Sequence, residues 1–171
     1  MSAALADWHD FYALLGTAAA TLIGAMFVVV SIGERYLTPE RIAATRVFVT
    51  ATVTHLSAAL AVSLLTMAPG LGDAALGSLV GLGALAGLGY AGHILVVRIW
   101  RHEVDLADRF WYAALPFLGY AVLAAAGVAL GLAQRRLGAY LLAGAAALLV
   151  LAAIRNSWDM IVFFATRRRE P

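Results

Sequence analysis

The residues of this sequence that could carry chemistry are a few polar side chains inside long apolar stretches. They are His55, His93, Arg155, Asn156 and Asp159. Ionisable groups are costly inside a membrane, where they commonly line ion paths, relay protons or pair with each other between helices. Each of these residues is therefore a candidate for function, provided that the stretches around them are membrane spans.

Composition indicates that these stretches are spans. The chain has 171 residues, of which 63% are hydrophobic and 13% charged, whereas a soluble domain has about 25% charged residues. Apolar blocks of 18 or more residues are typical of transmembrane helices. The sequence predicts an all-α fold, a polytopic transmembrane helix bundle that forms one domain over residues 1–171. The expected spans cover about residues 11–32, 47–67, 75–99, 110–132 and 137–164.

Arginine placement predicts the orientation of the bundle. All twelve basic residues are arginines, and most of them lie in alternate connections and at the C-terminus. Because positively charged loops stay in the cytoplasm, we expect the N-terminus outside and the C-terminus inside. Arg135 and Arg136 disagree, since they fall in an expected outer loop. The abundance of alanine, glycine, leucine and arginine indicates a GC-rich bacterial genome, and hence a bacterial inner membrane.

Helical rise places the candidate residues at a shared depth. At 1.5 Å per residue, His55, His93, Tyr120, Arg155 and Asp159 lie about 11 to 18 Å from the cytoplasmic ends of their spans. We therefore predict a polar slab that extends from near the midplane into the cytoplasmic half of the membrane.

Partners within this slab can be predicted from spacing. Arg155 and Asp159 share a helix face, but arginine before aspartate is the less favourable order for an intrahelical pair. We therefore expect them to find partners on other helices, with His55 and His93 as candidates. Pro116 has no backbone N–H, so we also expect a kink and a free carbonyl at Tyr112.

Glycine spacing predicts close helix packing. Small residues four apart let membrane helices approach each other closely. The contacts lie either inside one bundle or between subunits, and the span at 75–99 is expected to be central or inter-subunit. The glycines concerned are Gly77, Gly81, Gly83, Gly87, Gly127 and Gly131.

Three functional hypotheses follow from the polar slab. The leading one is an ion, proton or small-solute pathway in a homo-oligomer, with Asp159 as the charged group, Arg155 as its counter-ion and the histidines as relays. In the second, the slab only fastens the helices of an accessory or regulatory membrane subunit. The third is a b-type haem protein, with haem between His55 and His93 as the one cofactor considered.

Other chemistries find no support in the sequence. The chain has no cysteine, which excludes disulfides and thiolate metal sites. It has no H-E-x-x-H, nucleophile elbow or phosphate-binding glycine loop, so we assign no catalytic or metal-binding residue and lean away from an enzyme. It lacks the basic stripe of a nucleic-acid-binding protein. The expected partners are the lipid bilayer, further copies of the chain and other membrane subunits.

Two segments carry a resemblance to a known group of proteins. Residues 18–31, within the first span, resemble a family of small uncharacterised bacterial integral membrane proteins. Asn156-Ser157-Trp158-Asp159 resembles an Asn-small-Trp-Asp signature of the same family. The resemblance implies no activity, but it gives weight to Asn156, Trp158 and Asp159.

Overall fold

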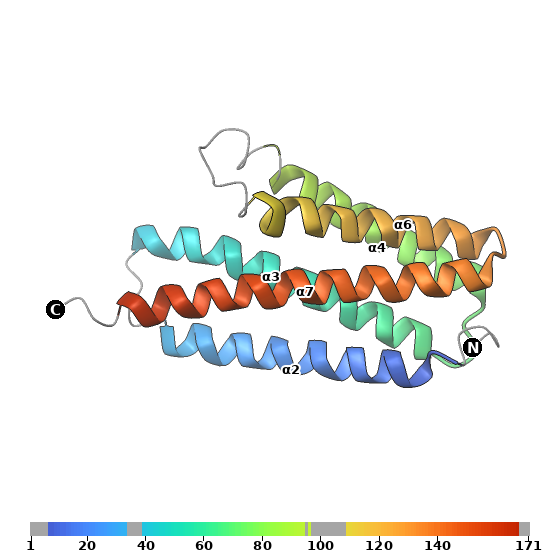
Figure 1. Cartoon of the computed structure of the whole chain (residues 1–171), viewed down its shortest axis with the longest axis horizontal. Coiled ribbons are helices and arrows are strands. Elements are labelled where there is room, and N and C mark those ends of the chain that lie inside the picture. The colour runs from blue at the N-terminus through green and yellow to red at the C-terminus, as the bar shows by residue number, and fades with distance from the viewer. Residues whose placement is uncertain (1–6, 34–38, 95, 97–108, 168–171) are drawn as a thin grey trace.

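The structure is a bundle of long apolar helices (Figure 1). The computed structural model describes residues 7–33, 39–94, 96 and 109–167, and of residues 33, 39–48 and 163–167 it describes the backbone alone. The helices in this part of the chain are α2 (His9–Gly33), α3 (Pro39–Met67), α4 (Asp73–Ile94), the π-helical turn η3 (Phe110–Ala114), which continues into α6 (Leu115–Gly131), and α7 (Arg135–Arg167).

These helices confirm the predicted fold class. Five of the described helical segments are long and apolar enough to cross a membrane, and they coincide with the five expected spans within a few residues. Large apolar side chains such as Leu14, Phe27, Leu64, Leu85 and Leu151 are exposed on the outside of the bundle, where they would meet lipid. The predicted end of the third span, at residues 95 and 97–99, lies outside the described residues.

The helices alternate in direction, and α7 lies at the centre. It packs against α3 on one side and α6 on the other, while α2 covers α3 and α4 covers α6. Helices α3 and α4 make few contacts with each other. The span expected to be central or inter-subunit, at 75–99, is therefore at an edge of the bundle. We call the two ends of the bundle the Arg135 end and the Arg167 end, after the first and last residues of α7.

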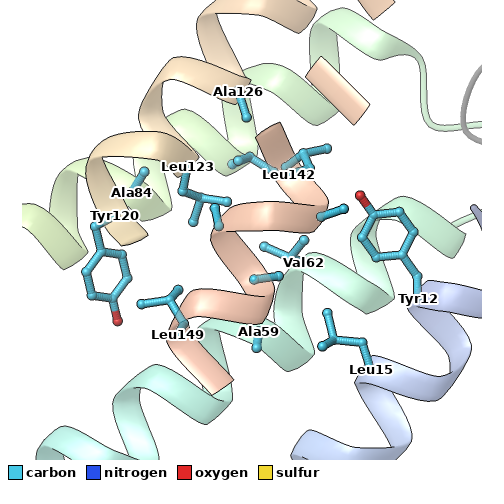
Figure 2. Close-up of a cluster of buried hydrophobic side chains, with 14 of the residues drawn as sticks. Tyr12, Leu15, Ala59, Val62, Ala84, Tyr120, Leu123, Ala126, Leu142 and Leu149 are labelled. Carbon is cyan, nitrogen blue, oxygen red and sulfur yellow. The ribbon is translucent and has the colours of Figure 1, made fainter. Parts of the chain in front are cut away.

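The core is built around α7. Figure 2 shows Leu142 and Leu149 of α7 in the middle of the core. Tyr120 and Leu123 of α6 lie on one side of them, and Tyr12 and Leu15 of α2 lie on the other. Alanines and glycines fill much of the remaining interface, so that the helix backbones approach closely. Without a hydrophobic driving force in lipid, such close packing is what holds membrane helices together.

The glycine motifs bring α4 and α6 together within one chain. A Cβ added at Gly77 would lie 2.7 Å from the carbonyl oxygen of Gly127, and one at Gly127 would lie 3.0 Å from Gly81. Gly87 leaves room for the ring of Tyr120. Of the two readings of these glycines, the structure supports contacts inside one bundle at these positions. At Gly83 and Gly131 a Cβ would meet nothing within 4 Å.

An ion pair at the Arg135 end involves one of the two arginines that disagreed with the charge pattern. The Nε atom of Arg135, in the first turn of α7, donates to the Asp73 carboxylate in the first turn of α4. The side chain of Asp73 is only 12% exposed. Arg135 is therefore paired within the bundle and fastens α7 to α4.

Candidate functional site

The polar residues predicted from the sequence form two groups in the structure. The first joins α3 to α6. His55 is buried, with 1% of its surface exposed, and its Nδ1 atom is hydrogen-bonded to the hydroxyl group of Tyr120 at 3.0 Å. The ring of Tyr120 packs against Gly87 of α4, in the space that a side chain at this position would fill. Two predicted site residues, His55 and Tyr120, are thus in direct contact.

The second group joins α7 to η3 and lies closer to the Arg167 end. We call η3 and α6 together the α6 segment. The hydroxyl group of Tyr112 donates to Oδ2 of Asp159 at 2.6 Å. The other carboxylate oxygen, Oδ1, accepts from Arg155 one turn earlier in α7. The side chains of Arg155 and Asp159 are 38% and 27% exposed, so the pair is only partly enclosed by the bundle.

The π-helical turn η3 positions Tyr112. It lies directly before Leu115 and Pro116, and the N–H of Leu115 donates to the carbonyl oxygen of Phe110. Proline disturbs the helical hydrogen-bond ladder on its N-terminal side, and the wider π turn accommodates this disturbance. π turns are frequent at functional sites, and here the turn carries the tyrosine that reaches Asp159. The kink at Pro116 and the free carbonyl at Tyr112 stay predictions from the sequence.

Asn156, on α7, is a buried polar side chain that belongs to neither of these two groups. It is 2% exposed and lies on the helix face that carries Ala153 and Met160, two members of a core cluster with Met26 and Leu56. Its Oδ1 atom has no hydrogen-bond partner among the described residues, and neither has Nε2 of His55. Buried polar atoms are nearly always satisfied by protein or by ordered water. These two atoms are thus the natural positions for internal water.

The two groups are separated along the membrane normal. Tyr112 and Tyr120 are eight residues apart on the α6 segment, which corresponds to about 12 Å of helix. The predicted slab is therefore a staggered series from His55 and Tyr120 to Tyr112, Arg155 and Asp159, with Asn156 on the same helix as Asp159. Asp159 is paired with Arg155 and Tyr112, and not with the histidines that the sequence suggested.

His93 does not join either group. It is exposed near the last described turn of α4, whereas His55 is buried and bonded to Tyr120. A haem between these two histidines stays a prediction from the sequence, which a visible absorption spectrum of the purified protein would test.

Tyr112 is the site residue that sequence reasoning missed. Only its carbonyl group was considered, through the proline four residues later. Tyr112 could have been found by depth, because it is level with Asp159 near the Arg167 end of the bundle.

The fold and the buried polar residues together show the class of protein. The chain is a multi-pass integral membrane protein with polar side chains enclosed among its helices. Compared with known proteins, it matches no family model, no curated protein and no solved structure. The resemblance to small bacterial membrane proteins remains a prediction from the first span and from the residues around Trp158.

Proposed function

We propose that this chain is a small integral membrane protein that conducts protons along a water-linked series of side chains in α3, α6 and α7. Within the wider hypothesis of an ion, proton or small-solute pathway, the proton is favoured because it moves along hydrogen-bonded groups without an open pore. A bacterial inner membrane, with the Arg167 end in the cytoplasm, remains part of this proposal.

The observation that supports the proposal most is that His55 Nε2 and Asn156 Oδ1 are buried without a hydrogen-bond partner among the described residues. A third such atom, Oδ1 of Asp73, lies apart from them at the Arg135 end. Leaving such a group unsatisfied in an apolar interior costs roughly 1–3 kcal/mol. A sequence optimised only for helix packing would place apolar side chains there. Buried polar groups that can hydrogen-bond to internal water are the usual constituents of a proton path.

Each residue in the series has a role that fits its contacts. Asp159 is the proton acceptor at the Arg167 end, with Arg155 as counter-ion and the Tyr112 hydroxyl as hydrogen-bond donor. His55 and Tyr120 form the inner relay, since imidazole and phenol can each donate and accept. Water at Asn156 would link the two groups. His93, which is exposed, has no part in this path.

Proton flux into proteoliposomes, driven by a potassium diffusion potential and followed with a pH-sensitive dye, tests the proposal. We expect wild-type protein to conduct protons, and Asp159→Asn to lower the rate at least ten-fold while retaining the fold, because the amide keeps the shape but cannot cycle a proton.

Asp73→Asn is the matched control. Asp73 is also an aspartate paired with an arginine, but at the Arg135 end and outside the series, so its variant should conduct like wild type. Equal flux in wild type and Asp159→Asn, or no flux in folded wild-type protein, would overturn the proton-path proposal.

A second candidate is an accessory subunit of a larger membrane assembly, and the exposed His93 favours it. Ionisable residues in membrane helices usually face protein or water, yet His93 lies on the outer side of the edge helix α4. A single cysteine at position 93 of this cysteine-free chain, cross-linked in native membranes, would form a heterologous adduct if another subunit covers this face. A disulfide-linked dimer would instead support the homo-oligomer that the sequence suggested.

A further inference from the structure

A groove runs between α3 and α4, the two neighbouring helices that make few contacts with each other. It has a volume of about 440 Å³, and residues of α6 form its floor. Figure 2 shows Tyr120 and Leu123 of the floor, and Val62 of one wall. It lies within the membrane-spanning segments Val49–Met67 and Asp73–Ile94, so it opens towards hydrocarbon.

We propose that this groove binds one acyl chain of a phospholipid from the leaflet on the side of the Arg135 end. The groove extends along α3 from Thr54 to Leu65 and along α4 from Leu79 to Tyr90. Leu65 lies two residues before the end of α3, and Leu79 lies six residues after the start of α4. The end of the groove at these residues therefore faces the turn that joins the two helices, and we assign the entry of the chain to that leaflet. This binding site shares Tyr120 with the proposed proton path, but its test does not depend on proton conduction.

The recessed part of the groove has room for a hydrocarbon chain but not for a whole helix. Eleven residue steps on each wall give a length of about 17 Å, and dividing the volume by this length gives a mean cross-section of about 26 Å². Apolar groups in contact lie about 4 to 4.5 Å apart, so one extended chain needs roughly 16 to 20 Å². A helix with its side chains is at least 10 Å wide and needs about 80 Å².

The chemistry of the lining also favours a chain without polar groups. Apart from four residues with hydroxyl groups, the lining is aliphatic or glycine. Of the hydroxyls, that of Thr54 donates to the carbonyl oxygen of Thr50, and that of Tyr120 is bonded to His55. Among the side chains that the structure describes, no charged one lines the groove, so a polar or charged ligand would lose hydration without compensation.

Small residues keep the groove open. Gly83 lines it, and a Cβ there would meet nothing within 4 Å. On the opposite wall, Ala61 is exposed. Leucine at either position would occupy the space that we assign to the acyl chain. Gly89, on the same helix as Gly83, is also exposed with nothing near its Cβ position, but it does not line the groove. It therefore provides a matched control.

Photo-cross-linking with a phosphatidylglycerol that carries a diazirine in its acyl chain tests this site, with labelled residues identified by mass spectrometry. In vesicles we expect labelling of Ser57 and Ala86, exposed residues on the two walls of the groove, to exceed that of the outer residues Leu14 and Phe27. Gly83→Leu should reduce groove labelling at least five-fold, and Gly89→Leu should leave it unchanged. Ala61→Leu serves as the second blocking variant if Gly83→Leu fails to fold.

Two outcomes would overturn the proposal. In the first, labelling of the groove is no stronger than that of Leu14 and Phe27 and does not change in Gly83→Leu or Ala61→Leu. The groove would then contact bulk lipid only, as the rest of the outer surface does. A disulfide-linked dimer through a single cysteine at position 83, but not at position 89, would make a second copy of the chain the occupant.

Discussion

At the scale of single residues, Arg155 and Asp159 show how a neighbouring helix can alter a local preference. Their order along α7 is the less favourable one for an intrahelical pair, yet they are paired. The second carboxylate oxygen of Asp159 accepts from Tyr112, which fixes the carboxylate where Arg155 can reach it. The helix packing therefore selects a pair that the isolated helix would form only weakly.

The hydroxyl group of Tyr120 gives a direct prediction about the buried histidine. Tyr120→Phe keeps the ring that packs against Gly87 but removes the partner of His55 Nδ1, which would leave both ring nitrogens unpartnered. We expect the free energy of unfolding in lipid micelles to fall by roughly 1–3 kcal/mol. Tyr140→Phe is the control, since Tyr140 is exposed and should change stability little. Equal stability of Tyr120→Phe and wild type would show that the hydrogen bond contributes nothing.

At the scale of helices, the close contact of α4 with α6 depends on the absence of side chains. Gly77→Ala would place a Cβ 2.7 Å from the Gly127 carbonyl oxygen. We expect it to destabilise the bundle by about 1–3 kcal/mol through overpacking. Gly89→Ala, where a Cβ meets nothing, should be neutral or stabilise by up to about 1 kcal/mol because alanine favours the helix. Thermal unfolding of the two variants checks this prediction, and a shared sign would contradict it.

The turn between α6 and α7 contains a strained residue. Ala133 has a φ of 60°, in the left-handed region that costs a residue with a Cβ about 1–2 kcal/mol. The hydrogen bond from the N–H of Gln134 to the carbonyl oxygen of Ala129 closes a Schellman motif, where glycine is the usual residue. Ala133→Gly should therefore raise the midpoint of thermal unfolding. A lower midpoint would show that the flexibility glycine adds to the unfolded chain outweighs the relieved strain.

Helix number, type and limits were predictable from the sequence, because apolar length and charge position determine them locally. The order of packing was not. Glycine content favoured a central or inter-subunit place for the span at 75–99. Within the chain its small residues pack against one close neighbour, α6, and alanines such as Ala145, Ala146 and Ala152 let α7 fill the centre. For the same reason, depth could single out His55, Tyr120 and Asp159 as candidates, while their hydrogen-bond partners depended on helix neighbours that spacing along one chain does not specify.

At the scale of the whole molecule, the absence of cysteine makes the orientation easy to test. A single cysteine at Pro69, in the exposed turn between α3 and α4, should react with a membrane-impermeant maleimide added to intact cells, because the arginine pattern places this end outside. A cysteine appended to the C-terminus should react only after the membrane is opened. The reverse pattern would invert the predicted topology, and with it the side on which Asp159 lies.

The most direct test of the central claim is detection of water beside His55 and Asn156. Solid-state NMR of isotope-labelled protein in bilayers, with magnetisation transferred from water, would report which side chains are hydrated. The proton-path account predicts early transfer to the His55 imidazole and the Asn156 amide, and late transfer to the core methyl groups of Leu142 and Leu149. Transfer to His55 and Asn156 as slow as to those leucines would mean a dry interior. The polar side chains would then only fasten the helices, and the account would be wrong.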